Sequence, residues 1–228
     1  VHVSRGLVGE QLDTVCEVIK RETSVRRVGA LAGPLGNAVL VDGNPGGAIV
    51  GTDFPEVAEA VRLAIGSERL RVYETDDRVG VEVGSALTGM LLFALGYAQG
   101  IGFGPSTVGV LASRGVSEIA RIAELLGGRV ETLSGLACLG DLVSAVAGDA
   151  RPEIELGRHM ANGASLDDAL ARIGTHVEST AVAARICRYA DRQGADLPIT
   201  KAVTQVLDGT LSSTEAIKAL MGRRVGRE

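Results

Sequence analysis

The sequence is poor in the residue types on which several classes of protein depend. It has no tryptophan, only 3% aromatic residues and three cysteines among 228 residues. So few aromatic side chains cannot form the stacking surface that holds the bases of single-stranded nucleic acids. The cysteines, Cys16, Cys138 and Cys187, form no CxxC pair. Their spacing argues against a disulfide framework or a zinc cage and favours a reducing compartment, by default the cytoplasm.

Negative charge outweighs positive charge, with 28 Asp and Glu against 23 Lys and Arg. The net charge is -5 and no run of like charges exceeds two residues, so the electrostatic footprint of a nucleic-acid-binding protein is absent. Lysine occurs only at Lys20, Lys201 and Lys218, which leaves three positions for any chemistry that requires a lysine. The chain opens on Val1, and residues 1–7 lack the basic and then apolar pattern of a signal peptide.

Several motifs are missing or out of context. The three histidines, His2, His159 and His176, show no metal-ligand spacing, so no metal site is predicted. The run Gly100–Pro105 is rich in glycine but lies between two apolar segments, whereas a dinucleotide loop follows a strand. We therefore expect a tight connection between two helices there. The sequence contains no GxGxxG, no P-loop and no GxSxG.

Residues 1–78 mix strand and helix patterns, which predicts part of a parallel α/β sheet. Apolar residues recur at helical spacing in Gly9–Glu22, and Pro55 opens a second helical segment. Short apolar runs bounded by glycine, proline or asparagine predict the strands Val28–Ala32, Ala38–Val41 and Ala48–Gly51, and the alternation of Arg69–Tyr73 predicts a further strand.

Residues 79–228 predict a larger all-α domain. From Val83 to Ser113 there is no charged residue, and a transmembrane span is the alternative for such a stretch. Repeated glycine and the lack of basic flanks favour a helix buried on all sides, and hence no membrane partner. Further helices are expected at Val116–Leu126, Thr132–Val146, Ile154–Asn162, Ser165–Ile173, Val177–Gln193, Thr200–Asp208 and Thr214–Met221.

One acidic residue stands in an apolar context. Asp141 follows Gly140 within the segment Gly135–Leu142. A buried carboxylate must be paired or serve as a site. Spacing alone leaves two alternatives open for it, a helix cap and a functional acid.

Seven short sequence motifs, by their order and spacing, resemble those of the bacterial NAD(P)-dependent glycerol-3-phosphate dehydrogenases. They are Ser4–Leu7, Gly33–Pro34, Val79–Leu87, Ser113–Val116, Gly135–Leu142, Val177–Glu178 and Leu197–Val203. The resemblance covers essentially the whole chain. It implies a partial Rossmann region, residues 1–78, that begins late in its domain without the glycine-rich half, followed by an all-α substrate and dimerisation domain, residues 79–228.

The resemblance also implies an activity and its partners. The family interconverts dihydroxyacetone phosphate and sn-glycerol 3-phosphate by hydride transfer with NAD or NADP, a step of glycerophospholipid metabolism. We therefore expect a cytoplasmic homo-oligomer, such as a dimer, that takes a small phosphorylated substrate. By the same resemblance the site residues fall at Thr88 and Asp141 (catalytic), at Arg5, Gly33, Asp141 and Arg151 (substrate) and at Arg5 and Glu178 (cofactor).

The sequence departs from the family pattern where the chemistry lies. The family's proposed general-acid lysine and the asparagine after it correspond to Thr88 and Gly89. A hydroxyl has neither the tunable pKa nor the positive charge that carbonyl reduction requires. The family's phosphate-binding Arg-Asn pair corresponds to Pro152 and Glu153, and Arg5 replaces another lysine. A guanidinium keeps the charge but does not shuttle a proton.

Three hypotheses follow from these departures. The first is an NAD(P)-dependent glycerol-3-phosphate dehydrogenase. The second is a non-catalytic relative that keeps the fold as a binding or oligomerisation module, and it explains the substituted residues better. The third is an oxidoreductase acting on another substrate, for which Arg5 and Arg151 would hold an anion.

The 228-residue chain is expected to bind NADH and NADPH weakly. Tight binding of a dinucleotide requires a glycine-rich turn and a helix N-terminus at the pyrophosphate, and this sequence contains no such turn. Titration calorimetry measures the affinity directly. A micromolar dissociation constant would contradict the prediction.

Overall fold

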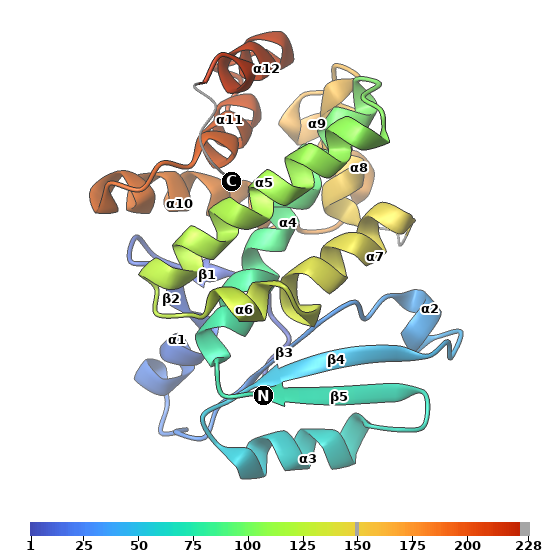
Figure 1. Ribbon diagram of the computed structural model, residues 1–228, viewed down its shortest axis with the longest axis vertical. Helices are drawn as coiled ribbons and strands as arrows, with labels where there is room; N and C mark the ends of the chain where they lie inside the picture. The colour runs from blue at the N-terminus through green and yellow to red at the C-terminus, as the bar shows by residue number, and fades with distance from the viewer. Residues whose placement is uncertain (149–150, 224–228) are drawn as a thin grey trace.

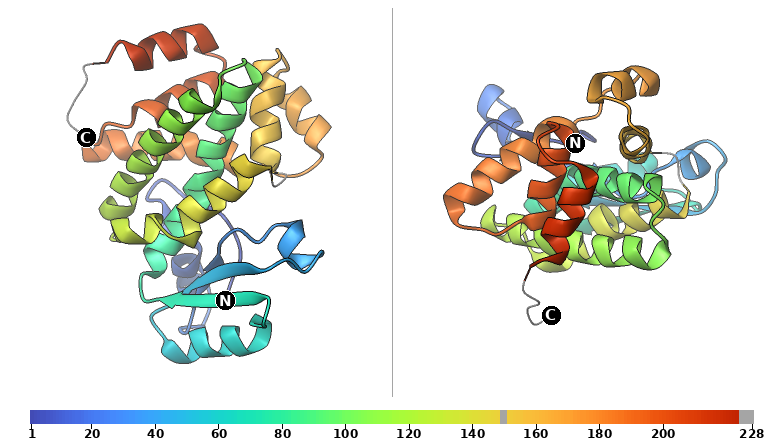
Figure 2. Two further views of the ribbon diagram at one scale, coloured as in Figure 1. Left: turned by 45° about the vertical axis from the view of Figure 1, so that its right-hand side comes forward. Right: turned by 90° about the horizontal axis from the view of Figure 1, so that it is seen from above.

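The computed structural model describes residues 1–148 and 151–223 of the chain, with the side chains of Asn37, Ala38 and Ser213 left aside. All strands of the described residues lie before residue 76, and helices follow from Arg78 onward (Figure 1). The predicted fold class, an α/β region followed by a larger all-α region, is confirmed. Figure 2 shows the sheet at one end of the molecule and the last helices at the other.

The sheet has three strands in the order β3 (Ala30–Ala32), β4 (Gly46–Gly51) and β5 (Leu70–Thr75). β4 and β5 run parallel and are joined by the helix α3 (Pro55–Ile65), which is the expected βαβ unit. β3 runs antiparallel to β4, so the prediction of a purely parallel sheet is wrong for this strand. An isolated bridge between His2 and Ala30 extends the sheet beyond β3.

A small hairpin precedes the sheet. Its strands are β1 (Leu7–Val8) and β2 (Asp13–Thr14), and the helix α1 (Val15–Glu22) follows directly. The hydroxyl of Thr14 accepts a hydrogen bond from the backbone N–H of Glu17, whose carboxylate accepts one from the backbone of Thr14. This capping box explains why the helix begins here rather than at Gly9.

The strand expected at Ala38–Val41 does not form, and the prediction is wrong. Residues Asn37–Leu40 make the short helix α2, in which the carbonyl of Gly36 accepts hydrogen bonds from Val39 and Leu40. The apolar run has four residues and ends at a turn, so periodicity could not separate a strand from one turn of helix.

The second half of the chain is helical throughout its described residues. Its elements are α4 (Arg78–Gly100), α5 (Pro105–Leu125), α6 (Val130–Leu133), the π-helical turn η1 (Leu136–Gly140), α7 (Asp141–Ala147), α8 (Pro152–Ala161), α9 (Leu166–Ile173), α10 (Ser179–Gln193), α11 (Pro198–Leu207) and α12 (Ser213–Met221). The run Gly100–Pro105 is the tight connection expected between two helices. The single helix expected at Thr132–Val146 is divided into α6, η1 and α7.

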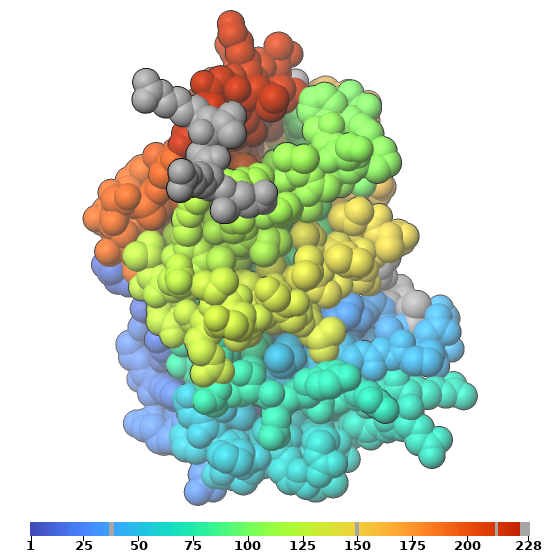
Figure 3. All heavy atoms as spheres, in the orientation of Figure 1, coloured from blue at the N-terminus to red at the C-terminus, as the bar shows by residue number. Residues whose placement is uncertain are grey.

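Helix α4 is the core of the molecule. Nineteen of its 23 residues are buried, and α5, α8, α10 and the sheet pack around it. Figure 3 shows the side chains of α5, α6 and α7 covering most of α4 on one face. α4 and residues 130–147 are both apolar and long enough to cross a membrane, but 94% of the α4 window is buried against 33% of the other. The burial of α4 confirms the expected core helix as far as Gly100. The rest of the charge-free stretch forms the connection to α5 and its first turns and is mostly exposed, so the expectation of burial on all sides is wrong there.

Two glycine residues let α8 approach α4 closely, because they place no side chain between the helices. A Cβ atom on Gly157 of α8 would overlap the carbonyl oxygen of Phe93, and one on Gly96 of α4 would overlap the carbonyl oxygen of Ile154. Backbone cannot move aside as the tip of a side chain can. The two glycines therefore fix how the first turns of α8 lie against α4.

Gly157→Ala is expected to lower the free energy of unfolding by about 1–3 kcal/mol, because the added methyl group overpacks this interface. Urea unfolding measures the change. Gly109→Ala is the matched control: a Cβ there meets nothing within 4 Å in the helix α5, so a gain of about 0.5–1 kcal/mol is expected. Equal effects of the two substitutions would contradict the close approach of the two backbones.

Candidate functional site

The acidic residue singled out in the sequence lies at an irregular point of the backbone. Asp141 is the first residue of α7 and directly follows the π-helical turn η1, where the N–H of Gly140 bonds to the carbonyl of Gly135. π-helical turns are rare and occur often at functional sites. The turn directs the Asp141 carboxylate inward, where the residue is only 1% exposed.

Two arginines from distant parts of the chain hold this carboxylate. Arg151 donates from Nη1 to Oδ1 of Asp141 at 2.8 Å and from Nη2 to Oδ2 at 2.9 Å. Arg5 donates from Nη1 to Oδ2 at 2.8 Å. The structure thus brings together three of the residues proposed from the sequence. Arg151 reaches both oxygens in the two-pronged geometry that gives strong charge-assisted bonds.

Thr88 lies on α4 and is completely buried. Its hydroxyl donates a hydrogen bond to the carbonyl of Gly84, one turn earlier, at 2.8 Å. Thr88 also contacts Cys138 of η1, where burial raises the pKa of the thiol to about 11 and the bond to Thr88 lowers it in part. The hydroxyl of Thr88 is therefore engaged within the protein and is not presented to a ligand.

The neighbouring Gly89 leaves space that other side chains occupy. A Cβ atom on Gly89 would lie 3.2 Å from Oε1 of Glu153 and 3.5 Å from Cβ of Ser179. Oε2 of Glu153 and Oγ of Ser179 are both buried without a hydrogen-bond partner. Buried polar atoms are almost always paired, so these two atoms indicate room for a polar ligand or a water molecule. Ser179 was missed in the sequence because nothing but its position after Glu178 singles it out.

Glu178, directly before Ser179, completes a group of neighbouring side chains that we call the ring around Gly89. Its members are Arg5, Asp141, Arg151, Glu153, Glu178, Ser179 and Arg185. Oε1 of Glu178 accepts a hydrogen bond from Arg185 at 2.7 Å and its Oε2 lies 3.0 Å from Nε2 of His176. A Cβ on Gly6 would lie 3.4 Å from Glu178, so this carboxylate is next to the segment that carries Arg5. The role of Arg185 was not predicted, because helical spacing alone does not tell which arginine of α10 faces the site.

Gly33 supports the site through its backbone. Its φ of +130° is disfavoured for residues with a side chain, and an added Cβ would lie 3.1 Å from the carbonyl oxygen of Gly47 and 3.7 Å from Leu136. Leu136 opens the turn that ends at Asp141. The glycine therefore lets the sheet approach η1, and it offers no side chain to a ligand.

The charges of the site are balanced. Arg5 and Arg151 face the carboxylates of Asp141 and Glu153, with Glu153 4.0 Å from Nε of Arg151. Arg185 is matched by Glu178. No described arginine of this group is left without an opposite charge, so the site lacks the excess positive charge that a phosphate dianion requires.

The described residues do not fit the pyrophosphate of a dinucleotide. Three junctions lead from the sheet into a helix, and the one after β3 enters α2, a helix of only four residues. The other two carry Asp53 before α3 and Asp76 and Asp77 before α4. α3 also begins with Pro55, which has no N–H to donate. Carboxylates at a helix N-terminus repel an anion that the backbone would otherwise attract. Neither of these two junctions therefore suits a bound pyrophosphate.

Known proteins resemble both the sequence and the fold. A sequence profile described as "NAD-dependent glycerol-3-phosphate dehydrogenase C-terminus" matches residues 77–218. Proteins named glycerol-3-phosphate dehydrogenase (NAD(P)+) from Methylibium petroleiphilum and Dechloromonas aromatica are 38% and 36% identical over 93% and 92% of this chain. The aligned part covers 64% and 63% of those relatives, so the chain spans less than two thirds of their length.

Solved structures of glycerol-3-phosphate dehydrogenases also resemble this chain. Glycerol-3-phosphate dehydrogenase from Coxiella burnetii is 25% identical and superimposes with a TM-score of 0.91 over 97% of this chain and 68% of its own. The glycerol-3-phosphate dehydrogenase of Plasmodium falciparum, 11% identical, has a TM-score of 0.88 over 99% of this chain and 65% of its own. This second likeness shows the fold alone.

Asp141→Asn is expected to lower the free energy of unfolding by about 3 kcal/mol, because it leaves two arginines facing a neutral amide in a buried place. Chemical denaturation measures the difference. Asp42→Asn, at an exposed bend, is the control and should change stability by no more than about 0.5 kcal/mol. A loss below about 1 kcal/mol for Asp141→Asn would show that the arginines do not depend on this carboxylate.

Proposed function

The chain belongs to the NAD-dependent glycerol-3-phosphate dehydrogenase family, and from this premise we propose that it is a member that has lost the reduction of dihydroxyacetone phosphate. It keeps the family fold as a module that binds a small polar ligand. The proposal rests on one observation: the buried hydroxyl of Thr88 donates a hydrogen bond to the backbone carbonyl of Gly84 in its own helix.

Reduction of a ketone needs a proton at the carbonyl oxygen as well as a hydride at the carbon. Around Gly89 the nearby candidates are Thr88, Arg5 and Arg151. The hydroxyl of Thr88 is engaged with Gly84, and guanidinium groups do not give up a proton at neutral pH. Asp141 holds both arginines and, as a carboxylate, raises the energy of a developing alkoxide. None of these four groups is therefore placed to act as the general acid.

Binding of the phosphate is affected as well. Where the resemblance places the family's Arg-Asn pair, this chain has Pro152 and Glu153, and Glu153 brings a negative charge next to Gly89. Arg151 is a cation at the adjacent position, but Asp141 occupies both of its terminal nitrogens. A phosphorylated substrate would have to displace Asp141 from its arginines.

A second candidate function is an NAD(P)-dependent oxidoreductase acting on a different substrate in the same ring. It is supported by the unpartnered Oε2 of Glu153 and Oγ of Ser179, which suit a ligand with hydroxyl or amine donors. A cytoplasmic location, an NAD or NADP cofactor and a homo-oligomeric state are part of this proposal and rest on the family alone.

Oxidation of NADH with dihydroxyacetone phosphate, by the longest native form of the protein, tests the proposal. We expect a rate about 10²- to 10⁴-fold below that of a family enzyme with the lysine, measured in parallel, because a positioned general acid contributes about that factor. Thr88→Lys with Gly89→Asn should not restore the rate, since the new side chain at position 89 meets Glu153. Adding Pro152→Arg and Glu153→Asn should restore part of it.

Glu153→Asn alone is the control, because it removes the obstruction at Gly89 without supplying an acid. Circular dichroism and thermal unfolding show whether each variant folds. A fast wild-type protein would refute the loss of activity. Rescue by the first two substitutions alone would show that Glu153 does not obstruct position 89.

A further inference from the structure

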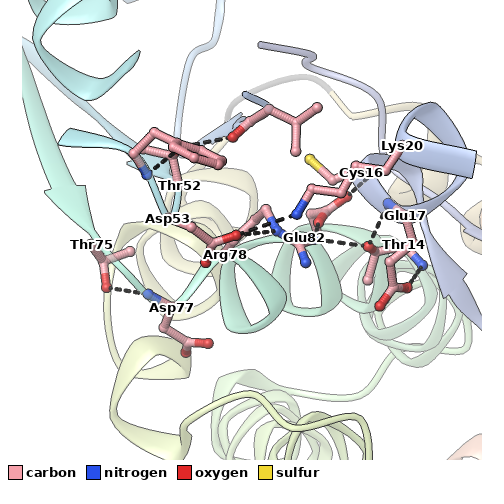
Figure 4. A network of polar contacts seen from close by, with 12 residues as sticks. Thr14, Cys16, Glu17, Lys20, Thr52, Asp53, Thr75, Asp77, Arg78 and Glu82 are labelled. Atoms are coloured by element: carbon pink, nitrogen blue, oxygen red, sulfur yellow. Dashed lines mark hydrogen bonds and ion pairs between the residues drawn. The ribbon is translucent and has the colours of Figure 1, made fainter. Parts of the chain in front are cut away.

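A second cluster of side chains that could bind a ligand lies outside the ring around Gly89. It joins His2, which pairs with the sheet, Cys16 in the first turn of α1 and Glu82 in the first turns of α4. A ligand atom of each residue lies within 4.8 Å of the other two. Nε2 of His2 is 3.0 Å from Oε1 of Glu82. Figure 4 shows Cys16 close to Glu82, with Arg78 beside the same carboxylate.

We propose that His2, Cys16 and Glu82 bind one divalent transition-metal ion, for which zinc is the best match. Imidazole nitrogen, thiolate sulfur and carboxylate oxygen are the donors that zinc takes in proteins. In a tetrahedral site with bonds near 2.0 Å, nitrogen and oxygen ligands lie about 3.3 Å apart. The separation of 3.0 Å between His2 and Glu82 is close to this value. The Cys16 sulfur, which lies within 4.8 Å of both atoms, has to come to about 3.5 Å of each when it bonds to the same ion.

The surroundings of the cluster suit a metal ligand set. Cys16 is fully buried and Glu82 is 3% exposed, so bulk water competes little for these groups. Arg78 donates to Oε2 of Glu82 and to the hydroxyl of Thr14, which fixes the carboxylate. Oε1 lies next to His2 and also accepts a hydrogen bond from the backbone N–H of Cys16 at 2.9 Å, so it keeps one lone pair for a metal ion. Outer partners of this kind orient ligands in known metal sites.

Binding requires a change of protonation. Burial, aided by the Glu82 carboxylate, raises the pKa of Cys16 to about 12, so the metal-free residue is a thiol. When sulfur bonds to the metal, its proton passes to solvent, and thiolate and carboxylate together neutralise the divalent ion. The N–H of Ser4, which faces Nδ1 of His2 at 3.2 Å in an exposed position, must turn to water because the imidazole then carries its proton on Nδ1.

A bound ion would tie three separate segments together. The first residues of the chain, α1 and α4 would share one centre, while the fourth ligand position stays open to water. Two effects oppose metal binding. The positive charge of Arg78 repels the ion, and the hydrogen bond from Ser4 to His2 is lost. The site is independent of the proposed function, since none of its residues belongs to the ring around Gly89.

Titration of the full chain with cobalt(II), a spectroscopic substitute for zinc, tests the proposal. One equivalent should produce the absorption band of a cobalt–thiolate bond, and added zinc should abolish it. Cys16→Ser should lose the band, whereas Cys187→Ser and Cys138→Ser, the other two cysteines of the sequence, should keep it. Absence of the band in the wild type, or its survival in Cys16→Ser, would overturn the proposal.

His2→Ala provides a variant that leaves the buried core intact, in case Cys16→Ser does not fold. It should weaken cobalt binding at least about 10-fold, because one of three protein ligands is removed. Zinc should raise the melting temperature of the wild type and have a clearly smaller effect on His2→Ala. Equal cobalt affinity and equal thermal shifts in the two proteins would exclude His2 as a ligand and refute the three-residue site.

Discussion

Helix α4 has to be enclosed by protein, and the rest of the structure is arranged to enclose it. Its segment from Val83 to Gly100 carries no charge, so exposure to water would cost about 25 cal/mol for each square ångström of apolar surface. α5 and α8 cover its flanks, and the sheet packs against its first turns. Because the helix passes through both halves of the molecule, each residue of the site is positioned directly or indirectly by contact with it.

The ring around Gly89 is a partly buried polar site in which opposite charges are paired. Asp141 holds two arginines, and Glu178 holds Arg185. Charges paired in this way orient one another through charge-assisted hydrogen bonds. Among the described residues of this group, the buried atoms without a hydrogen-bond partner are Oε2 of Glu153, Oγ of Ser179 and Nε of Arg185, and they favour recognition of a polar group.

Patterns that depend on several residues could be predicted from the sequence, and single contacts could not. The charge-free run identified α4. The order of the family motifs pointed to Asp141 and Arg5, which are 136 positions apart in the chain and in contact in the structure. The π-helical turn before Asp141 was not predictable, because periodicity does not reveal a single extra residue in a turn. Ser179 and the proposed metal ligands are assembled by tertiary packing from segments that are unrelated in the sequence, so no spacing rule applies to them.

The contact of bare backbones at Gly96 and Gly157 has an evolutionary consequence. Because α8 cannot slide along α4, the distance between positions 89 and 153 is fixed by residues that never touch a ligand. A larger side chain at one position then requires a smaller one at the other, which makes their substitutions strongly epistatic. Families built on this helix pair would change their ligand by paired exchanges across the interface, with the helices themselves staying in register.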